Sequence, residues 1–257
     1  MQSSKDVKFG DIIKSLISKY LKEFGCCTVK DIFYLARNSG YELKLEHIRY
    51  YLESLEAHGN IKRTKIARKN VYYLTKSEEH IRFTLRQIED QIVTMLSKGL
   101  LFHTAEIINE IERVFKVGRG VIHLILQQLA FKGEISYFFG LSYNGKKFRL
   151  YFLTENKKEL EKQIIRVKKY VSFKRLVFPN EKAVEELVFF DENGVWKDLK
   201  MIHLDVQDFK NILFYLSYLG EVNQIYFVQG YPFAVPGHAS QLESILKKIN
   251  SNLEDNK

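Results

Sequence analysis

The sequence predicts a mainly α-helical fold with small β-hairpins, of the α+β class, and three observations lead to this prediction. Apolar residues recur every three to four positions over most of the 257-residue chain, as they do along one face of a helix. Short strand-like runs separated by turn residues follow these stretches. The same order of helices and strands occurs twice, 74 residues apart. The chain is therefore expected to contain small tandem domains.

The first 75 residues predict three helices followed by two strands. The helices are expected at 9–24, 29–38 and 43–58, and the strands at Ile61–Lys65 and Val71–Leu74. Thr28 is a suitable N-cap for the second helix, because its hydroxyl can accept a backbone N–H of the first turn. In the third helix, Ile48, Leu52 and Leu55 form one apolar stripe. The polar segment from Ala67 to Asn70 is the expected turn between the strands.

The next stretch repeats this order. Helices are expected at 84–98, 104–115 and 119–132, and strands at 135–139 and 148–153. The match is strongest at the end of the third helix, where both copies read Leu-x-x-Leu-x-x-x-Gly-x-Ile. The matching residues are Leu52, Leu55, Gly59 and Ile61 in the first copy and Leu126, Leu129, Gly133 and Ile135 in the second.

Three helices, this ending and a hairpin together resemble the winged helix variant of the helix-turn-helix superfamily. The resemblance covers about 8–75 and 84–154, and implies tandem winged-helix modules at 1–78 (the first module) and 79–154 (the second module). In DNA-binding members, the third helix enters the major groove and the hairpin wing reaches the flanking backbone or minor groove.

The remainder of the chain predicts a basic connecting helix at 155–175 and a C-terminal α+β domain at 176–257. In this domain, helices are expected at 181–190 and 205–219, and strands at 222–228 and 231–235. The second of these helices ends at Gly220 and enters a strand, so the domain resembles a third, degenerate winged helix. Asp208, Asn211 and Ser217 are expected to be exposed and do not suit DNA. A protein partner or a second copy of the chain is expected there.

The positive charge is concentrated in the two modules. Residues 1–80 hold 15 basic and 10 acidic residues, residues 81–154 hold 10 and 6, and the remainder holds 15 of each. The whole formal net charge of +9 therefore lies in the first 154 residues. Such a segment favours a polyanionic partner.

The resemblance directs attention to the third helix and the hairpin of the first module. The predicted DNA-binding residues are Lys44, His47, Arg49 and Tyr50 on the helix and Lys62, Arg63, Lys65, Arg68 and Lys69 on the hairpin. Arg49, His47 and Tyr50 can reach base edges and sugars, although Glu46 and Glu53 favour an ordinary solvated face. The hairpin segment 61–70 contains no acidic residue, and such density suits phosphate contact.

The second module departs from this pattern. Its third helix carries Val121, His123 and Leu124 where the first module has His47, Arg49 and Tyr50. Further DNA-binding candidates lie around this helix and in the hairpin: Lys116, Arg119, Lys146, Lys147 and Arg149. The module can therefore bind phosphates without reading bases, or pack against another module; the sequence leaves both open.

Catalytic patterns are weak, and we expect no enzyme, no cofactor and no metal site. The segment from Gly140 to Lys147 follows the spacing of a phosphate-binding loop but ends in Lys and precedes a strand. Asp191, Asp198 and Lys200 only loosely resemble a metal-dependent nuclease site. The seven histidines show no metal-ligand spacing with either cysteine.

The sequence also bears on the cellular compartment. Cys26 and Cys27 are adjacent, which does not favour a disulfide, and they are expected to be buried in a short strand. No uninterrupted apolar segment approaches the length needed to span a membrane, and no signal peptide is expected. A cytoplasmic, nucleoid-associated protein is the resulting expectation.

The functional prediction is a double-stranded DNA-binding protein, either a transcription regulator or a replication or partition factor. Two alternatives stay open. One is a protein–protein scaffold built from winged helices in a chromosome or polymerase assembly. The other is a site-specific nuclease with winged-helix recognition domains.

Overall fold

The computed structural model describes residues 4–142, 145–177, 204, 206–220, 224–228 and 231–235. The chain divides into two compact units, each taken separately below. The first comprises Met1–Lys98 with Ala105–Ser136, and the second Gly99–Thr104 with Tyr137–Lys257. The boundary runs through the predicted second module, because its helices belong to the first unit and its hairpin to the second.

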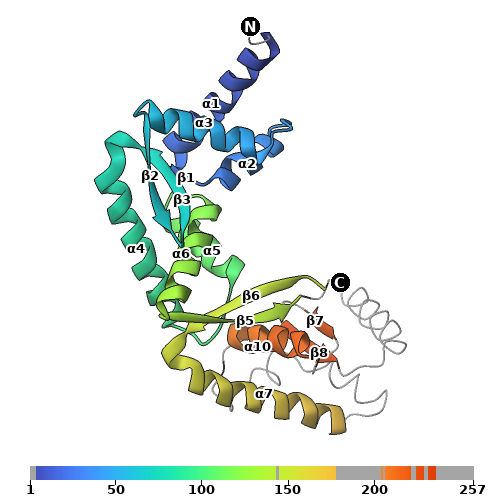
Figure 1. The fold of residues 1–257 in the computed structure, drawn as a ribbon. Helices are drawn as coiled ribbons and strands as arrows, with labels where there is room; N and C mark the ends of the chain where they lie inside the picture. The colour runs from blue at the N-terminus through green and yellow to red at the C-terminus, as the bar shows by residue number, and fades with distance from the viewer. Residues whose placement is uncertain are drawn as a thin grey trace, which may run out of the picture. The chain divides into compact units, whose positions relative to one another are not determined.

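The first unit begins with three helices and a small sheet (Figure 1). The elements are α1 (Ser4–Phe24), β1 (Cys26–Cys27), α2 (Val29–Asn38), α3 (Leu45–Ala57), β2 (Ile61–Ile66) and β3 (Lys69–Leu74). The helices bury their apolar stripes against one another, with Ile17, Ile32, Ile48 and Leu52 almost inaccessible to solvent. Thr28 caps α2 as expected, and its side chain forms a reciprocal capping box with Asp31.

The sheet of β1, β2 and β3 is buried on both faces along β3. The strand order is β1-β3-β2, all antiparallel, and Cys27 lies opposite Tyr72. Tyr72 joins the core formed by α1–α3, whereas its neighbours Val71 and Tyr73 point to the other face. Both neighbours are also buried, and α4 and α6 contact the strands. The hairpin is therefore packed between two groups of helices.

Three more helices complete the first unit: α4 (Glu78–Leu96), α5 (Thr104–Val114) and α6 (Arg119–Lys132). Helix α6 ends at Gly133, whose φ of 79° is the left-handed conformation that favours glycine at a helix C-terminus. At its other end, α6 meets α2, where the Gly120 N–H donates to Asp31 Oδ1 at 2.9 Å.

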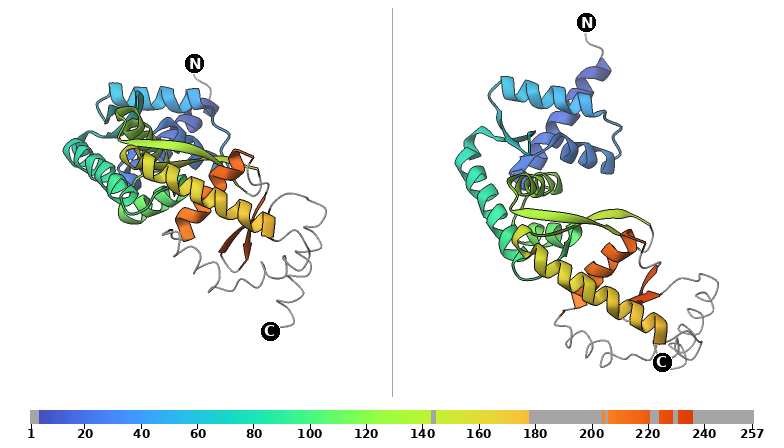
Figure 2. Two further views of the ribbon diagram at one scale, coloured as in Figure 1. Left: turned by 90° about the horizontal axis from the view of Figure 1, so that it is seen from below. Right: turned by 60° about the horizontal axis from the view of Figure 1, so that its bottom comes forward.

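The second unit is built on another three-stranded sheet. Its elements are β4 (Phe102–His103), β5 (Ile135–Leu141), β6 (Lys147–Leu153), α7 (Lys157–Val177), α10 (Val206–Tyr218), β7 (Gln224–Val228) and β8 (Tyr231–Val235). The order of the first three strands is β4-β6-β5. Helix α10 contacts α7, β4 and β6, and it lies beside α7 in both views of Figure 2. Leu150 and Phe152 of β6 pack there against Leu160, Phe209 and Leu213.

Asp208, Asn211 and Ser217 of α10 were expected to be exposed, and for the first two the structure shows that this was wrong, whereas Ser217 is half-buried. Asp208 is 6% exposed and Asn211 0%. Asp208 accepts the backbone N–H groups of Leu100 and Leu101 at 2.9 and 3.0 Å, and Asn211 donates to the Leu101 carbonyl at 2.7 Å. These hydrogen bonds make the burial of both polar side chains favourable, because each side chain pairs with backbone groups of the segment before β4.

The described elements confirm the mainly helical α+β class. Their bounds lie close to those expected, apart from longer starts of α1 and α4 and the two-residue strand β4, and the short strand expected at Cys26 and Cys27 is β1. The predicted helix at 181–190 lies outside the described residues. Among the helices that are described, none combines the length and the apolar character needed to cross a membrane.

Candidate nucleic-acid interface

The β2–β3 hairpin is tighter than its sequence predicted. Ile66 pairs with Lys69, so the turn contains only Ala67 and Arg68, with φ values of 48° and 64°. A two-residue turn with both φ values positive matches the right-handed twist of the flanking strands, but it strains residues other than glycine and asparagine. Arg68 is thereby held at the tip of the hairpin.

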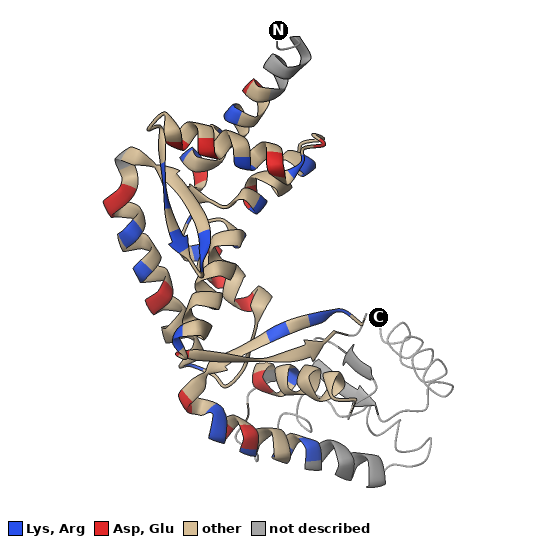
Figure 3. Ribbon diagram, viewed as in Figure 1, with Lys and Arg blue, Asp and Glu red and all other residues tan. Residues whose placement is uncertain are grey.

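The five cations of this hairpin are all exposed, and they fall into two groups. Lys62 and Arg63 are paired, with Glu78 at 2.6 Å and with Glu56 at 3.0 Å. Lys65 and Lys69 have no carboxylate within ion-pair distance among the described residues, and the Arg68 guanidinium lies 6.0 Å from the ring centre of Phe131. Figure 3 shows these cations along the β2 and β3 arrows. The distal half of the hairpin therefore carries uncompensated positive charge.

Helix α6 fixes the position of this hairpin tip. The Ala67 N–H donates to Gln128 Oε1 at 3.2 Å, and Gln128 in turn donates to Glu89 of α4 at 2.8 Å. Lys132 also pairs with Glu89, at 2.7 Å. These bonds orient the tip from two helices, so the cations near it are presented on a supported hairpin.

On α3, the predicted residues occupy the expected face. Ile48 and Leu52 point into the core, whereas His47, Arg49 and Tyr50 are exposed, Tyr50 to 67%. Lys44, also exposed, is the N-cap of the helix but makes no side-chain capping bond. Arg63 of β2 reaches Glu56 of α3, which ties this helix to the hairpin. The helix face and the hairpin are thus parts of one structure.

The apolar face of α6 is already covered within the first unit. Val121 is 0% and Leu124 5% exposed, and α6 contacts α2, β1 and β2. Of the two readings left open, packing against the first module is therefore observed for this face. Lys116 and Arg119 are exposed, and Arg119 forms a two-bond ion pair with Glu112 at 2.8 and 3.0 Å.

The cations of the β5–β6 hairpin lie against aromatic rings. Lys147 Nζ is 3.9 Å from the ring centre of Phe139 and 4.9 Å from that of Tyr218, and the Arg149 guanidinium is 4.6 Å from that of Tyr137. We call these five residues the aromatic-cationic patch. Lys146, at the turn, is also exposed. Sequence reasoning identified the three cations but missed the three rings, although the alternation of Tyr137 and Phe139 along a strand was a usable signal.

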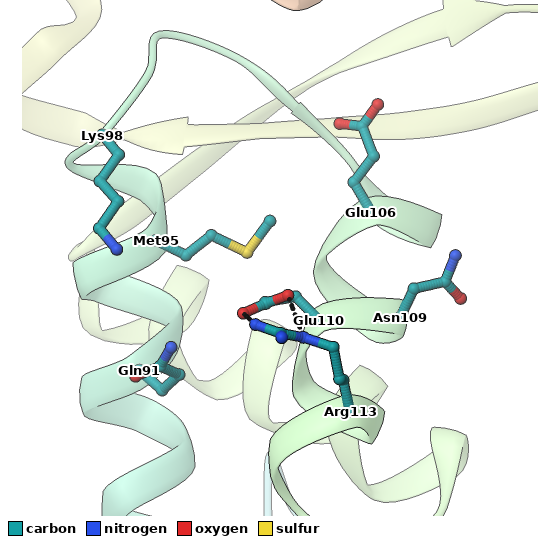
Figure 4. Close-up of a pocket in the computed structure, with 7 residues that line it drawn as sticks. All are labelled: Gln91, Met95, Lys98, Glu106, Asn109, Glu110 and Arg113. Atoms are coloured by element: carbon teal, nitrogen blue, oxygen red, sulfur yellow. Dashed lines mark hydrogen bonds and ion pairs between the residues drawn. The ribbon is translucent and has the colours of Figure 1, made fainter.

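A groove between α4 and α5 is lined by Gln91, Met95, Lys98, Glu106, Asn109, Glu110 and Arg113 (Figure 4). Its Arg113 and Glu110 bind each other at 2.7 and 3.1 Å, so their charges are internally compensated. Nowhere in the described part do three His, Cys, Asp or Glu side chains gather as a metal site requires. Asp191, Asp198 and Lys200 lie outside the described residues.

Comparison with known proteins gives no family for this chain. No protein-family model and no curated protein matches it. Among solved structures, it is similar to the hypothetical protein PyrSV_gp04 from Pyrobaculum spherical virus, with 16% identity and a TM-score of 0.34 over 60% of this chain and 99% of the other. A likeness at this level carries no functional argument.

Proposed function

We propose that this chain is a double-stranded DNA-binding protein with tandem winged-helix modules, acting as a transcription regulator or as a replication or partition factor. In this proposal, α3 lies against the bases of the duplex, and the distal β2–β3 hairpin binds the phosphates beside it. The cations Lys116 and Arg119 and the β5–β6 hairpin add contacts to the backbone.

The observation that carries the proposal is the uncompensated charge of Lys65, Arg68 and Lys69 on a supported hairpin. Ion-paired cations have partly exchanged their solvation for a carboxylate, so they gain less from a phosphate. Lys65 and Lys69 have no such carboxylate among the described residues. Each phosphate that they neutralise releases condensed counterions, which makes the binding favourable and dependent on salt.

Replacing the three distal cations tests the proposal. The wild-type chain and the variant Lys65→Gln/Arg68→Gln/Lys69→Gln are titrated into a pool of fluorescent genomic duplexes at several salt concentrations, with anisotropy as the readout. We expect the variant to bind more weakly, and the slope of log K against log salt to shrink by about 3, because each phosphate contact contributes about 0.9.

A matched control removes the same charge elsewhere. Lys14, Lys19 and Lys22 are exposed on α1, so Lys14→Gln/Lys19→Gln/Lys22→Gln also lowers the net charge by three. This control is expected to keep most of the affinity and of the salt slope. Equal losses in the two triple variants would mean that overall charge, and not the hairpin, holds the DNA.

One of the features that favour the scaffold alternative is the apolar face of the helix at 119–132, with the acidic C-terminal segment as the other. Val121 and Leu124 are buried within the first unit, so those side chains are not available to a partner. No described feature favours the nuclease alternative.

A further inference from the structure

We infer that the aromatic-cationic patch of the β5–β6 hairpin binds unpaired DNA, with bases stacked on Tyr137 and Phe139 and phosphates held by Lys147 and Arg149. This goes beyond duplex binding by the first module. It rests on the proposed function only in taking the strand to be DNA and not RNA.

The patch offers flat apolar surfaces to solvent. Tyr137 and Tyr218 are each 38% exposed, and Phe139 is half-buried. Tyr137 and Phe139 are two residues apart on β5, so they share one face of the sheet, and their ring centres are 5.5 Å apart. Two neighbouring rings on one strand form a platform on which successive bases can stack.

The platform is rigid because the other face of the hairpin belongs to a core. Phe138 stacks on Tyr215 of α10 with ring centres 4.4 Å apart, and Phe148 meets Phe214 edge to face. Leu150 is 0% exposed on the same side. A base that stacks on this hairpin therefore does not have to order it first, which lowers the entropic cost of binding.

The charge of the patch is also uncompensated. No acidic residue occurs from Ile135 to Leu153. Lys147 and Arg149 have no carboxylate within ion-pair distance among the described residues, and their partners are aromatic rings and tyrosine hydroxyls. A ring attracts a cation without neutralising it. A phosphate can therefore draw Lys147 away from Phe139, which exposes the face of the ring to a base.

This combination favours an unpaired strand over a duplex. Bases in a duplex are stacked on one another, and their faces are not accessible until they are unstacked. An unpaired strand presents both its bases and its phosphates to one surface. Rings that alternate with cations can bind such a strand, because the rings stack on the bases and the cations hold the phosphates.

Anisotropy with two fluorescent probes tests the inference. One probe is oligo(dT) of about 15 nucleotides, and the other is a blunt duplex closed by a hairpin. The variant Tyr137→Leu/Phe139→Leu keeps apolar side chains but removes both rings. We expect its affinity for oligo(dT) to fall about 10-fold or more, because stacking contributes roughly tenfold per base. Its affinity for the duplex should fall much less, because the variant keeps Lys146, Lys147 and Arg149, which are the hairpin's cations.

Two controls keep this result separate from the proposed function. Phe83→Leu removes another exposed ring, on α4, and should leave oligo(dT) binding unchanged. The variant Lys65→Gln/Arg68→Gln/Lys69→Gln should bind the duplex more weakly and keep its affinity for oligo(dT). The inference is wrong if the double variant binds oligo(dT) as the wild type does, if poly-glutamate competes as well as oligo(dT), or if oligo(U) binds more tightly.

A measurement on the unmodified protein covers the case in which the double variant does not fold. Ultraviolet crosslinking of the wild-type chain to oligo(dT), followed by peptide mass spectrometry, should place the crosslinks within 135–153. Crosslinks confined to other segments would overturn the inference.

Discussion

The carboxylate of Asp31 accepts a hydrogen bond at 2.9 Å from the backbone N–H of Gly120, 89 residues later in the chain. The same side chain accepts the N–H and the hydroxyl of Thr28, both at 2.7 Å. The Asp31 carboxylate therefore accepts hydrogen bonds at the N-terminus of α2 and at the N-terminus of α6. A negative charge is favourable at both places, because helix N-termini carry unsatisfied N–H groups and the positive end of the helix dipole.

Gly120→Ala should destabilise the protein although alanine is the better helix former. A β-carbon at Gly120 would lie 2.5 and 2.7 Å from the two Asp31 carboxylate oxygens and 2.7 Å from Thr28 Oγ1. We expect the free energy of unfolding in urea to fall by about 1–3 kcal/mol, as it does for overpacked sites. In an Asp31→Ala background the same change should cost less, because the clash with the carboxylate is removed and only that with Thr28 Oγ1 remains. An equal or higher stability of the single variant would contradict the contact.

The sequence predicted the Thr28 cap of α2 but not the contact between Asp31 and Gly120. Thr28 could be identified as an N-cap because capping depends on residues three positions apart. Asp31 and Gly120 are far apart in sequence, and no local pattern pairs them. The burial of Asp208 and Asn211 in α10 was not predicted for the same reason, since their side chains form hydrogen bonds with backbone groups about 110 residues away.

The candidate DNA-binding residues show a similar division between what the sequence predicts and what it does not. Periodicity correctly placed Tyr50 opposite the buried face of α3 and Arg49 at its exposed flank, because helix geometry alone decides that. It could not distinguish cations with carboxylate partners, such as Lys62, from those without, such as Lys65. It also could not show that α6 would bury Val121, since this depends on how two groups of helices meet.

Arg68→Gly should stabilise the fold and weaken duplex binding. The left-handed backbone of Arg68 costs a side chain about 1 kcal/mol that glycine avoids. We expect Tm to rise by about 2 °C, while duplex affinity falls because a cation leaves the hairpin tip. Lys19→Gln, which removes one exposed cation from α1, should change neither property by as much. A lower Tm together with unchanged affinity would contradict both parts.

Arg49→Ala should alter which duplexes are bound more than how tightly the average duplex is bound. Arg49 is exposed on α3, and an arginine can bind a guanine through two hydrogen bonds, which discriminates by about 1–3 kcal/mol. Selection of bound sequences from a random duplex library should show a relaxed preference at one position. Lys65→Gln should instead weaken all duplexes alike. An unchanged selected motif for Arg49→Ala would exclude base contact by this residue.

The two cysteines should react slowly with thiol reagents in the folded protein. Burial raises the pKa of Cys26 to about 12 and that of Cys27 well above its usual value, and the nearby Asp31 raises both further. Because the thiolate is the reactive form, titration with an aromatic disulfide at pH 8 should be slow, and both thiols should appear on unfolding in guanidinium. Immediate reaction of either thiol in the native protein would contradict its burial in β1.

The stability of the second unit should depend on pH through His103. Burial, with a smaller contribution from Lys210, lowers the pKa of His103 from 6.5 to about 4. Between these two values the unfolded chain binds more protons than the folded one, so the free energy of unfolding falls as the pH falls. We expect His103 to contribute a loss of about 1–2 kcal/mol between pH 7 and pH 4, because its partial exposure lets solvent screen the charge. Urea denaturation of the wild type and of His103→Gln measures this loss, because the glutamine variant lacks the proton uptake.

As the pH falls from 7 to 4, the wild type should therefore lose more stability than His103→Gln does. The control variant His80→Gln, at an exposed site on α4, should lose as much as the wild type. A constant difference between wild type and His103→Gln from pH 7 to pH 4 would show that His103 is not held neutral against Phe148, whose ring centre lies 4.0 Å away.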